Sequence, residues 1–487
     1  MSRPRGLRHG AVPLVVLLLA LVAAACTDGR LEGPARPTGS GGSGEVVLAS
    51  GRDVTGEAGI RKQLIDAWNA EQQREGTGRW ARLVELPGSA DEQRSQLLGA
   101  LQSGSARYDV VNLDVTWVPE FAAAGLIRPL PGDLVDDDVV PSVARTARWD
   151  GELYAVPFNS DVGLLYYRRD YLRKAGVDDT DPFGPDTDWR TVRELRNSLA
   201  DASDRLPEAY EESWTTQLDE YEGRTVNAVE AFASVPGGGP FTDGEGRYTG
   251  TERTLEAGVA ELRRRTDTAY TLSAAFRSDE AESVADFADG RTAFLRHWPY
   301  VYRSLHQSLT EDQVGVAPLP GRAVLGGQNL AVTRASAQSD AARDLIGFLT
   351  GRESERCLLD AGFAATRTSA YTDDDLTCGT ATSNGATGSP GATVSPGASS
   401  SGSPPAAPAS GERADRMPRD GRGRPAYARD VLLPALRDAV QRPRTPQYGA
   451  FTQTFTTTLG PLFGSTPPTD AELAARLDEA LRRVLGD

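Results

Sequence analysis

Histidine and cysteine are scarce in this sequence, with three of each among 487 residues. One histidine and one cysteine fall within the first 26 residues, so the rest of the chain holds two of each. A zinc site needs several such side chains at short spacings, and no spacing here resembles one. Catalysis by a histidine base has equally little support. We therefore expect no metal site and no histidine-dependent catalytic centre.

Phosphate-binding signatures and positive charge are also lacking. The sequence has no GxxxxGK[ST] stretch, and no GxGxxG follows a predicted strand. Its 52 Lys and Arg residues are outnumbered by 68 Asp and Glu residues, which gives a formal net charge of -16. A chain with that acidic excess and no basic stripe is a poor partner for nucleic acid. We expect neither a cofactor nor a nucleic-acid partner.

A long apolar run lies close to the N-terminus. Three arginines precede the sequence AVPLVVLLLALVAAA at residues 11–25, and Cys26 follows it. The run is short for a membrane span, and the small residues before Cys26 suit a signal peptidase. Residues 1–25 are therefore predicted to be a signal peptide that is removed on export.

The residues around Cys26 indicate how the exported protein is held. Small residues that end at a cysteine resemble a bacterial lipobox, although Ala23 stands where that pattern more often has Leu. The resemblance implies that Cys26 is lipidated, and acyl chains at about 0.8 kcal/mol per buried methylene would anchor it to the extracellular face of the cell membrane. Residues 26–44 would then be a flexible tether. A fully secreted protein with an incidental Cys26 is the alternative.

The two remaining cysteines are Cys357 and Cys378, about twenty positions apart. Outside the cytoplasm, two such thiols pair more readily than they stay free or bind a metal. We predict a disulfide between them, which would contribute roughly 3 kcal/mol in the chain-entropy picture.

The length of the chain exceeds what one hydrophobic core usually organises, so two lobes with a cleft are expected. Strands are predicted at 45–50, 81–86 and 108–113, with amphipathic helices at 57–73 and 91–104 between them. This alternation favours an α/β sheet with helices on both faces. Further helices are predicted at 189–202, 251–266, 280–289, 299–307, 341–350, 428–441 and 471–485.

A low-complexity segment at residues 379–417 interrupts the pattern. From 379 to 410 almost every residue is Gly, Ser, Pro, Ala or Thr, and none is charged. Such a composition cannot bury enough apolar surface to fold. Because helical periodicity resumes behind it, we predict a disordered insert that emerges from a folded domain.

Asp114 directly follows a predicted strand, and Asp53 lies just past another. The ligand crevice of an open α/β sheet lies beyond the carboxyl ends of its strands, so both should face one crevice. Around it we place planar, acidic, amide and guanidinium side chains, namely Trp117, Phe158, Asn159, Glu280, Trp298, Gln328, Arg442 and Tyr448. A sugar suits this mixture, because its C–H faces pack on aromatic rings and its hydroxyls bond to carboxylates, Arg and Asn.

Each of these side chains also has a purely structural interpretation. Asp114 could cap the helix that follows it. Glu280 could be a favourable charge in the first turn of a helix. Trp117 could be an ordinary core residue. The functional interpretation depends on their occurring together.

Seven motifs follow one another along the mature chain. They are LDVTWVPEFAAAGLIRPL, GELYAVPFNSDVGLLYYRRDYL, YEGRTVNAVE, DFADGRTAFLRHWPYVY, VGVAPLPG, LGGQNLAV and RPRTPQYGAF. This ordered set resembles the extracellular solute-binding proteins of bacterial ABC importers, in their maltose and trehalose-type carbohydrate branch. The resemblance covers most of the mature chain and depends on the order of the motifs.

The resemblance implies a two-lobe, periplasmic-binding-protein-like (type II) α/β fold with crossover strands at a hinge. One lobe would comprise residues 45–156 and 322–365. The other would comprise residues 157–321, 366–378 and 418–487. Cargo would bind between the lobes without chemical change, so we expect no enzymatic activity.

Residue positions also carry over from the family. Those that match its sugar contacts are Asp114, Asn159, Glu280, Trp298, a turn formed by Leu325, Gly326 and Gly327, and Arg442, with Asp53 a weaker match. Asp114 would accept hydroxyl hydrogen bonds at the mouth of the cleft, with Trp117 packed beneath it. Gln328 stands where relatives often have Trp, which removes a stacking plane.

The implied function is capture of a carbohydrate, a di- or oligosaccharide, and its delivery by hinge closure to the membrane permease of an ABC transporter. We expect a monomer. One alternative is a secreted glycoside hydrolase, which would need two carboxyl groups about 5 to 10 Å apart. Others are a solute-binding protein for a polyol, a peptide or a glycerophosphodiester, and a surface lipoprotein that serves a sensor partner.

Overall fold

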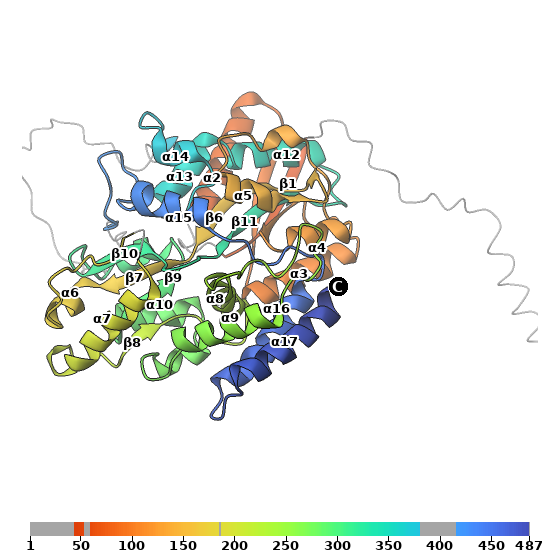
Figure 1. Cartoon of the computed structure of the whole chain (residues 1–487). Helices are drawn as coiled ribbons and strands as arrows, with labels where there is room; N and C mark the ends of the chain where they lie inside the picture. Colours follow the sequence, from red (N-terminus) through yellow and green to blue (C-terminus); the bar gives the residue numbers. More distant parts are fainter. Residues whose placement is uncertain (1–42, 53–58, 185–186, 380–414, 487) are drawn as a thin grey trace, which may run out of the picture. The chain divides into compact units, whose positions relative to one another are not determined.

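The computed structural model describes residues 43–52, 59–184, 187–379 and 415–486 (Figure 1). Its strands are β1 (Gly44–Gly51), β2 (Arg79–Leu86), β3 (Val110–Asp114), β4 (Arg148–Trp149), β5 (Glu152–Leu153), β6 (Val156–Val162), β7 (Leu164–Arg168), β8 (Glu212–Thr215), β9 (Thr292–His297), β10 (Val314–Pro318) and β11 (Leu325–Val332). The first helices are α2 (Ile60–Glu75), α3 (Ala90–Gln102), α4 (Val118–Ala123), α5 (Pro141–Ala144), α6 (Arg169–Lys174), α7 (Trp189–Asp201), α8 (Glu222–Ala233) and α9 (Glu252–Arg265). They are followed by α10 (Glu280–Ala288), α11 (Val301–Leu305), α12 (Ser339–Leu349), α13 (Arg352–Asp360), α14 (Thr368–Thr372), the π-helical turn η6 (Ala428–Leu432), α15 (Leu433–Asp438), α16 (Tyr448–Leu459) and α17 (Asp470–Leu485).

The first lobe is built on a five-stranded sheet with the strand order β2-β1-β3-β11-β6. β1 is parallel to β2 and β3, whereas β11 is antiparallel to β3 and β6. Val46 and Leu48 of β1 join the core formed with α2 and α12, while Val47 and Ala49 join the core formed with α3 and α4. Because helices bury both faces, the strand is a continuous apolar run. The predicted α/β organisation is confirmed.

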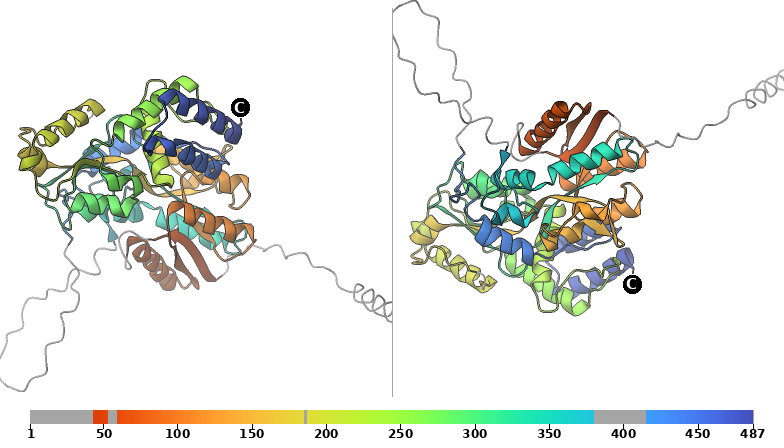
Figure 2. Two further views of the ribbon diagram at one scale, coloured as in Figure 1. Left: turned by 90° about the horizontal axis from the view of Figure 1, so that it is seen from below. Right: turned by 90° about the horizontal axis from the view of Figure 1, so that it is seen from above.

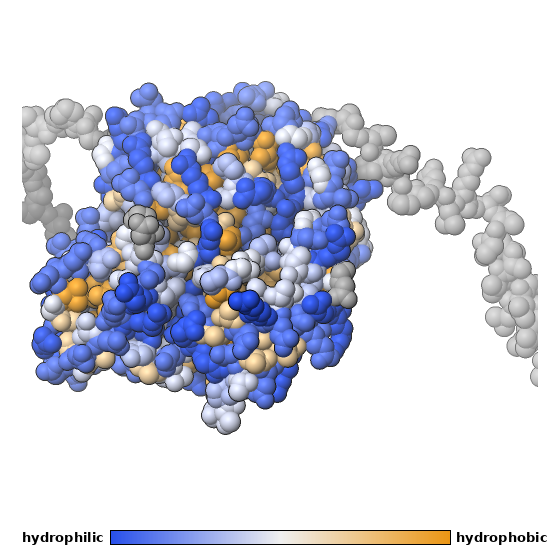
Figure 3. Space-filling model, in the orientation of Figure 1, coloured by the Kyte–Doolittle hydropathy of each residue, from blue (hydrophilic) through white to orange (hydrophobic). Residues whose placement is uncertain are grey.

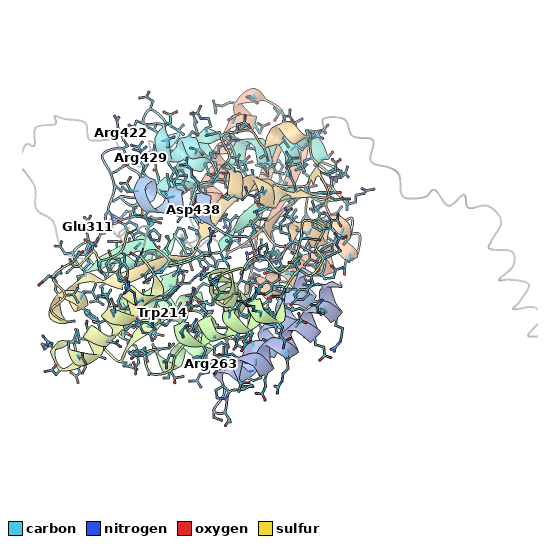
Figure 4. The ribbon with its side chains drawn as sticks, viewed as in Figure 1. Trp214, Arg263, Glu311, Arg422, Arg429 and Asp438 are labelled. Atoms are coloured by element: carbon cyan, nitrogen blue, oxygen red, sulfur yellow. A yellow bond between two sulfur atoms is a disulfide. The ribbon has the colours of Figure 1, made fainter. Side chains whose placement is uncertain are left out.

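The second lobe is built on a four-stranded sheet with the order β10-β7-β9-β8. β7 is antiparallel to β9 and β10, and β8 is parallel to β9. Leu165 and Tyr167 of β7 share a core with α6 and α7. In that core Trp214, labelled in Figure 4, packs edge-on against Trp189, with 5.4 Å between their rings. This packing fixes β8 and β9 relative to their helices.

The C-terminal helices complete the packing around α8. α17 lies along α9 in Figures 1 and 2, and the apolar side chains of α16 and α17 share one core with those of α8, α9 and α3. Arg263 of α9, labelled in Figure 4, pairs with Asp470 at the start of α17, where Nε and Oδ1 are 2.8 Å apart. The C-terminal helices α16 and α17 therefore help hold α8 in place, and the first turn of α8 lines the cleft described below.

Three segments run side by side through the hinge between the two sheets. Gly163 joins β6 to β7, and its N–H donates to the carbonyl oxygen of Val324 (3.3 Å) in the segment before β11. The N–H of Leu325 in turn donates to the carbonyl oxygen of Val440 (2.7 Å), after α15. A Cβ on Gly163 would collide with the carboxylate of Glu230, which explains a glycine there. The predicted crossover strands are present.

The first sheet extends past the lobe boundary that the sequence places at residue 156. β6 pairs with β11 as far as Val162, so the first sheet continues beyond residue 156. The division between the lobes in terms of residue ranges stays a prediction. The predicted signal peptide, Cys26 and Asp53 lie outside the described residues, as do the tether up to residue 42 and the insert between residues 380 and 414.

The disulfide, the length of the helices and the exposed surface complete the description of the fold. Cys357 and Cys378 form a disulfide, as predicted. None of the helices that the structure describes combines the length and the apolar character needed to cross a membrane. The face shown in Figure 3 is mostly hydrophilic, and among the described residues only Trp80 is a large apolar side chain with substantial exposure, at 47%.

Candidate functional site

A cleft of about 590 Å³ receives residues from both lobes. The first lobe contributes the ends of β1 and β3, the middle of β6 and the start of β11. The second lobe contributes the first turns of α8 and α10 and the residues that follow β9. A volume of this size falls within the range of roughly 300–1,000 Å³ that is typical of small-molecule sites.

Most of the residues predicted from the sequence line this cleft. They are Asp114, Trp117, Asn159, Glu280, Trp298, Gly326, Gly327, Gln328 and Arg442. Leu325, Phe158 and Tyr448 do not line it, because their side chains are buried in the cores with 0, 1 and 0% exposure. The next residues along the chain, Asn159 and Gly326, reach the cleft in place of Phe158 and Leu325.

The register of the first sheet explains why distant residues meet. Asp114 is the last residue of β3 and pairs with Gln328 of β11, which in turn pairs with Asn159 of β6. The three side chains therefore form a row across three strands at the edge where β3 ends. This is the crevice position expected for an open α/β sheet.

The predicted turn at Leu325–Gly327 is wrong, because these residues begin the strand β11. Gly327 has φ +111°, and a Cβ there would lie 2.5 Å from the carbonyl oxygen of Asn159. A Cβ on Gly326 would lie 3.1 Å from Cζ3 of Trp298. The glycines are needed for close packing between strands and against the indole, and no turn is required.

Arg442 forms the centre of an ion cluster that joins the lobes. Its Nη2 donates to both carboxylate oxygens of Asp114 (2.8 and 3.1 Å), and its Nη1 donates to Oε1 of Glu222 (2.5 Å). Glu222 also accepts hydrogen bonds from Tyr448 and Thr452. Burial acts to lower the pKa of Arg442, but Asp114, Tyr448 and Glu222 together raise it well above its usual value. The guanidinium stays charged and its partners are largely satisfied.

The structural alternative for Asp114 can now be resolved. The residue at the N-cap of α4 is Trp117, without a side-chain cap bond, so Asp114 does not cap that helix. Its Oδ1 instead accepts from the backbone and hydroxyl of Thr116 (2.9 and 2.7 Å). Trp117 is 5% exposed and packs in the core that α3 and α4 share with α8, α9, α16 and α17. This burial is what an ordinary core residue shows, and the packing of Trp117 beneath Asp114 stays a prediction.

Glu280 and Trp298 are held together by hydrogen bonds. Oε1 of Glu280 accepts from the indole Nε1 of Trp298 (3.4 Å), and Oε2 accepts from the hydroxyl of Tyr221 (2.7 Å). His297 accepts the Trp298 N–H at Nδ1 (2.8 Å), so its Nε2 donates to the carbonyl oxygen of Glu280 (3.1 Å). Burial lowers the pKa of His297 to about 3, so the ring stays neutral and fixes both residues.

The indole of Trp298 rests on a buried ion pair. The guanidinium of Arg296 lies 3.9 Å from the ring centroid and donates to both oxygens of Glu230 on α8 (3.0 and 2.6 Å). Arg296 thus covers one face of the ring while the ring lines the cleft. A planar side chain immobilised in this way is suited to stack against a bound molecule, because little rotamer freedom is lost on binding.

Asp161 lines the cleft and was not predicted from the sequence. No described residue donates a hydrogen bond to its carboxylate, and its Oδ1 is buried. Burial raises the pKa of Asp161 to about 7, against the opposing influence of Arg61. Asp161 is two positions from Asn159 on β6, so the two-residue period of a strand places both on one face. That period was the signal that could have identified it.

Arg61 is a second residue that the sequence analysis missed. Its Nη1 donates to Ser50 (3.0 Å) and to the carbonyl oxygen of Gly51 (2.9 Å), and its Nη2 donates to Gln328 (2.8 Å). It lies in the first turn of α2, where a cation is unfavourable with the helix dipole. An arginine at such a position is a sequence signal for a role outside the helix.

The arrangement of these side chains can bind a small molecule. Within the described ranges there is no group of three or more His, Cys, Asp or Glu side chains that could hold a metal ion. The cleft provides acidic acceptors, an amide, guanidinium groups and an indole from both lobes. Such a set fits recognition of a polar guest with an apolar face.

Comparison with known proteins identifies the relatives of this chain. The family model described as bacterial extracellular solute-binding protein matches residues 61–356. A "Probable ABC transporter-binding protein" of Deinococcus radiodurans is 28% identical over 328 residues, which cover 65% of this chain and 74% of the relative. A "Probable amino-acid ABC transporter periplasmic-binding protein" of Sinorhizobium fredii is 26% identical over 315 residues, which cover 62% of this chain and 69% of the relative.

Solved structures of binding proteins share the fold. Maltose-bound MalE3 of T. maritima superposes with a TM-score of 0.68 at 23% identity, covering 91% of this chain and 100% of that chain. The likeness confirms the two-lobe fold predicted from the motif order. The members matched are binding proteins, so the hydrolase alternative is not supported. With the match over residues 61–356, the chain belongs to the bacterial extracellular solute-binding protein family.

Proposed function

We propose that the protein captures a carbohydrate, a di- or oligosaccharide, in the cleft between its lobes and presents it to the permease of an ABC transporter. The observation that carries the proposal is the immobilised indole of Trp298 in a cleft otherwise lined by acceptors and donors from both lobes. A sugar ring offers an apolar face to the indole and hydroxyls to the polar groups. The maltose in the MalE3 relative supports the same class of cargo.

Capture requires closure of the hinge. Asp114 and Asn159 approach the cleft from the first sheet, whereas Glu280 and Trp298 approach it from the second lobe. A ligand that contacts both sets stabilises the closed arrangement, since some of its contacts exist only there. Small-angle scattering should therefore show a smaller radius of gyration with saturating cargo, and equal radii would contradict closure.

A thermal-shift screen tests the class of cargo. The panel contains neutral mono-, di- and oligosaccharides, polyols and amino acids, and we expect the largest rise in Tm with a saccharide. Trp298→Ala should weaken binding of that saccharide at least tenfold. Trp80→Ala is the matched control, because Trp80 is exposed on β2 and does not line the cleft.

Amino-acid cargo is the second candidate function, and the name of the Sinorhizobium fredii relative is the observation that favours it. The same screen decides between the two. A rise in Tm with amino acids and none with saccharides or polyols would replace the carbohydrate proposal.

The place of the protein is part of the proposal. Lipidation of Cys26 after signal-peptide cleavage would hold a monomer at the extracellular face of the membrane, within reach of a permease. Cell fractionation tests this, with the wild type expected in the membrane fraction and Cys26→Ala in the medium or the soluble fraction. Recovery of the wild type outside the membrane fraction would refute the anchor.

A further inference from the structure

Six carboxylates of the described residues line the cleft, and five of them are already engaged. The six are Glu92, Asp114, Asp161, Glu222, Asp279 and Glu280. Glu92 accepts from the N–H of Ser89, and Asp279 accepts from backbone N–H groups at the start of α10. The others bond to arginine, hydroxyl or indole donors as described above. Asp161 alone receives no hydrogen bond from any described residue.

The cations around Asp161 are committed to other groups. Arg442 is bound by two carboxylates, and Arg296 is paired with Glu230. Within the described residues, the acceptors of Arg61 include Ser50, Gly51, Asn159 and Gln328. Arg52 also lines the cleft, and its side chain is exposed beyond the end of β1. The negative charge of Asp161 thus has no partner of its own within the described residues.

An aromatic ring stands beside this carboxylate. A Cβ built on Gly326 would lie 3.1 Å from Cβ of Asp161 and 3.1 Å from Cζ3 of Trp298, so the two side chains flank the same glycine. Arg296 covers one face of the indole. A carboxylate next to an aromatic ring is the combination that favours an ammonium group, which gains a charge-assisted hydrogen bond and a cation–π contact.

We propose, on the basis of the capture function above, that the cargo carries a protonated amine, as an amino sugar does, and that Asp161 binds this amine beside Trp298. A neutral hydroxyl would donate one hydrogen bond but supply no charge to compensate the ionised form of Asp161, whose Oδ1 is buried without a hydrogen-bond donor. An ammonium group supplies both the donor and the opposite charge. Anionic cargo is disfavoured for the same electrostatic reason.

The charge of Asp161 makes binding of an amine depend on pH. Burial raises its pKa to about 7, with Arg61 on α2, Arg296 on β9 and Arg442 after α15 opposing the shift and Asp114 on β3 adding to it. A bound cation favours the carboxylate, so amine binding releases a proton. Affinity should therefore rise by about tenfold for each pH unit between 5 and 6.5, where Asp161 of the empty cleft is mainly protonated.

The experiment uses matched pairs of ligands on the purified protein. Neutral saccharides and their amino analogues, such as glucose with glucosamine, galactose with galactosamine and cellobiose with its diamino analogue, are titrated by calorimetry at pH 6.5. We expect at least one amino member to bind tenfold or more tightly than its neutral partner, with proton release on binding. Asp161→Asn should remove both the preference and the proton release.

A second carboxylate provides the control. Glu355 on α13 is also buried with a pKa raised to about 8 by burial, but it does not line the cleft. Glu355→Gln should keep the amine preference, and loss of the preference in this variant as well would overturn the assignment to Asp161.

The remaining outcomes separate this proposal from the capture function. Binding of neutral members without any amine preference refutes the amine and leaves carbohydrate capture intact. A preference that persists in Asp161→Asn refutes the role of Asp161. Absence of binding by every saccharide of either kind counts against both proposals.

Discussion

Two acidic regions of the cleft differ in how their charges are satisfied. In the Arg442 cluster, formed by Arg442, Asp114 and Glu222, two carboxylates share one guanidinium and also accept hydroxyl donors. Asp161, on β6, has no such donor among the described residues. A satisfied buried charge holds structure together, whereas an unsatisfied one is costly unless a ligand completes it. The comparison distinguishes a part of the cleft whose charges are satisfied within the protein from a part where the proposed amine would complete an unsatisfied carboxylate.

The largest expected effect comes from breaking the satisfied region. Arg442→Met leaves the buried Glu222 and the partly exposed Asp114 without their cation, and loss of one partner of a buried ion pair typically costs about 3–5 kcal/mol. We expect the free energy of unfolding in urea to fall by that amount. Arg52→Met, an exposed arginine of the same cleft, is the control and should change stability by less than about 0.5 kcal/mol. A small loss in Arg442→Met would show that the cluster is not structural.

The opposite sign is expected in the unsatisfied region. The pKa of Asp161 is about 7 in the folded protein against roughly 3.9 when unfolded, so its ionisation destabilises the fold as pH rises from 4 to 7. Asp161→Asn should therefore stabilise the unliganded protein at pH 8, on the order of 2 kcal/mol or a few degrees in Tm. The gain should shrink towards pH 4 and disappear near pH 3, where the carboxyl is mainly protonated in both states.

Glu355→Gln sharpens this prediction. Burial raises the pKa of Glu355 to about 8. Glu355→Gln should therefore gain stability relative to the wild type as the pH rises from 4.5 to 8, as Asp161→Asn does. Only Asp161→Asn should also change ligand affinity. An Asp161→Asn variant that is less stable than the wild type at pH 8 would show that the carboxylate has a stabilising partner.

The smallest effect on stability is expected at Glu280. Its carboxylate accepts neutral hydrogen-bond donors, unlike Asp161, but is not paired with an arginine, unlike Asp114 and Glu222. It accepts from both Tyr221 and Trp298, and Glu280→Gln can keep only one of these bonds through its remaining carbonyl oxygen. We expect a loss of about 1 kcal/mol or less in unliganded stability. Ligand affinity should fall more, by about tenfold, because the cleft loses a carboxylate acceptor. Calorimetric titration and thermal denaturation of the same preparation measure both quantities.

Much of the fold and part of the cleft could be predicted from local pattern. The apolar runs of β1 and β3 alternate with helices, and this order determines an α/β sheet whose crevice lies beyond Asp114. Asp161 was missed although its spacing from Asn159 gave a signal, because a lone carboxylate in a strand has no distinctive local neighbours. The supposed turn at Gly326 and Gly327 failed for a related reason, since two glycines also serve close packing within a strand.

The sequence alone determined which elements form, because propensity, apolar periodicity and strand length act over a few residues. The tertiary structure alone decided which charged groups are satisfied. Asp114 and Arg442 are 328 positions apart, and their pairing depends on the β3–β11 register and the path of the chain after α15. Electrostatic energy depends on distance in space and on burial, and neither is set by position along the chain.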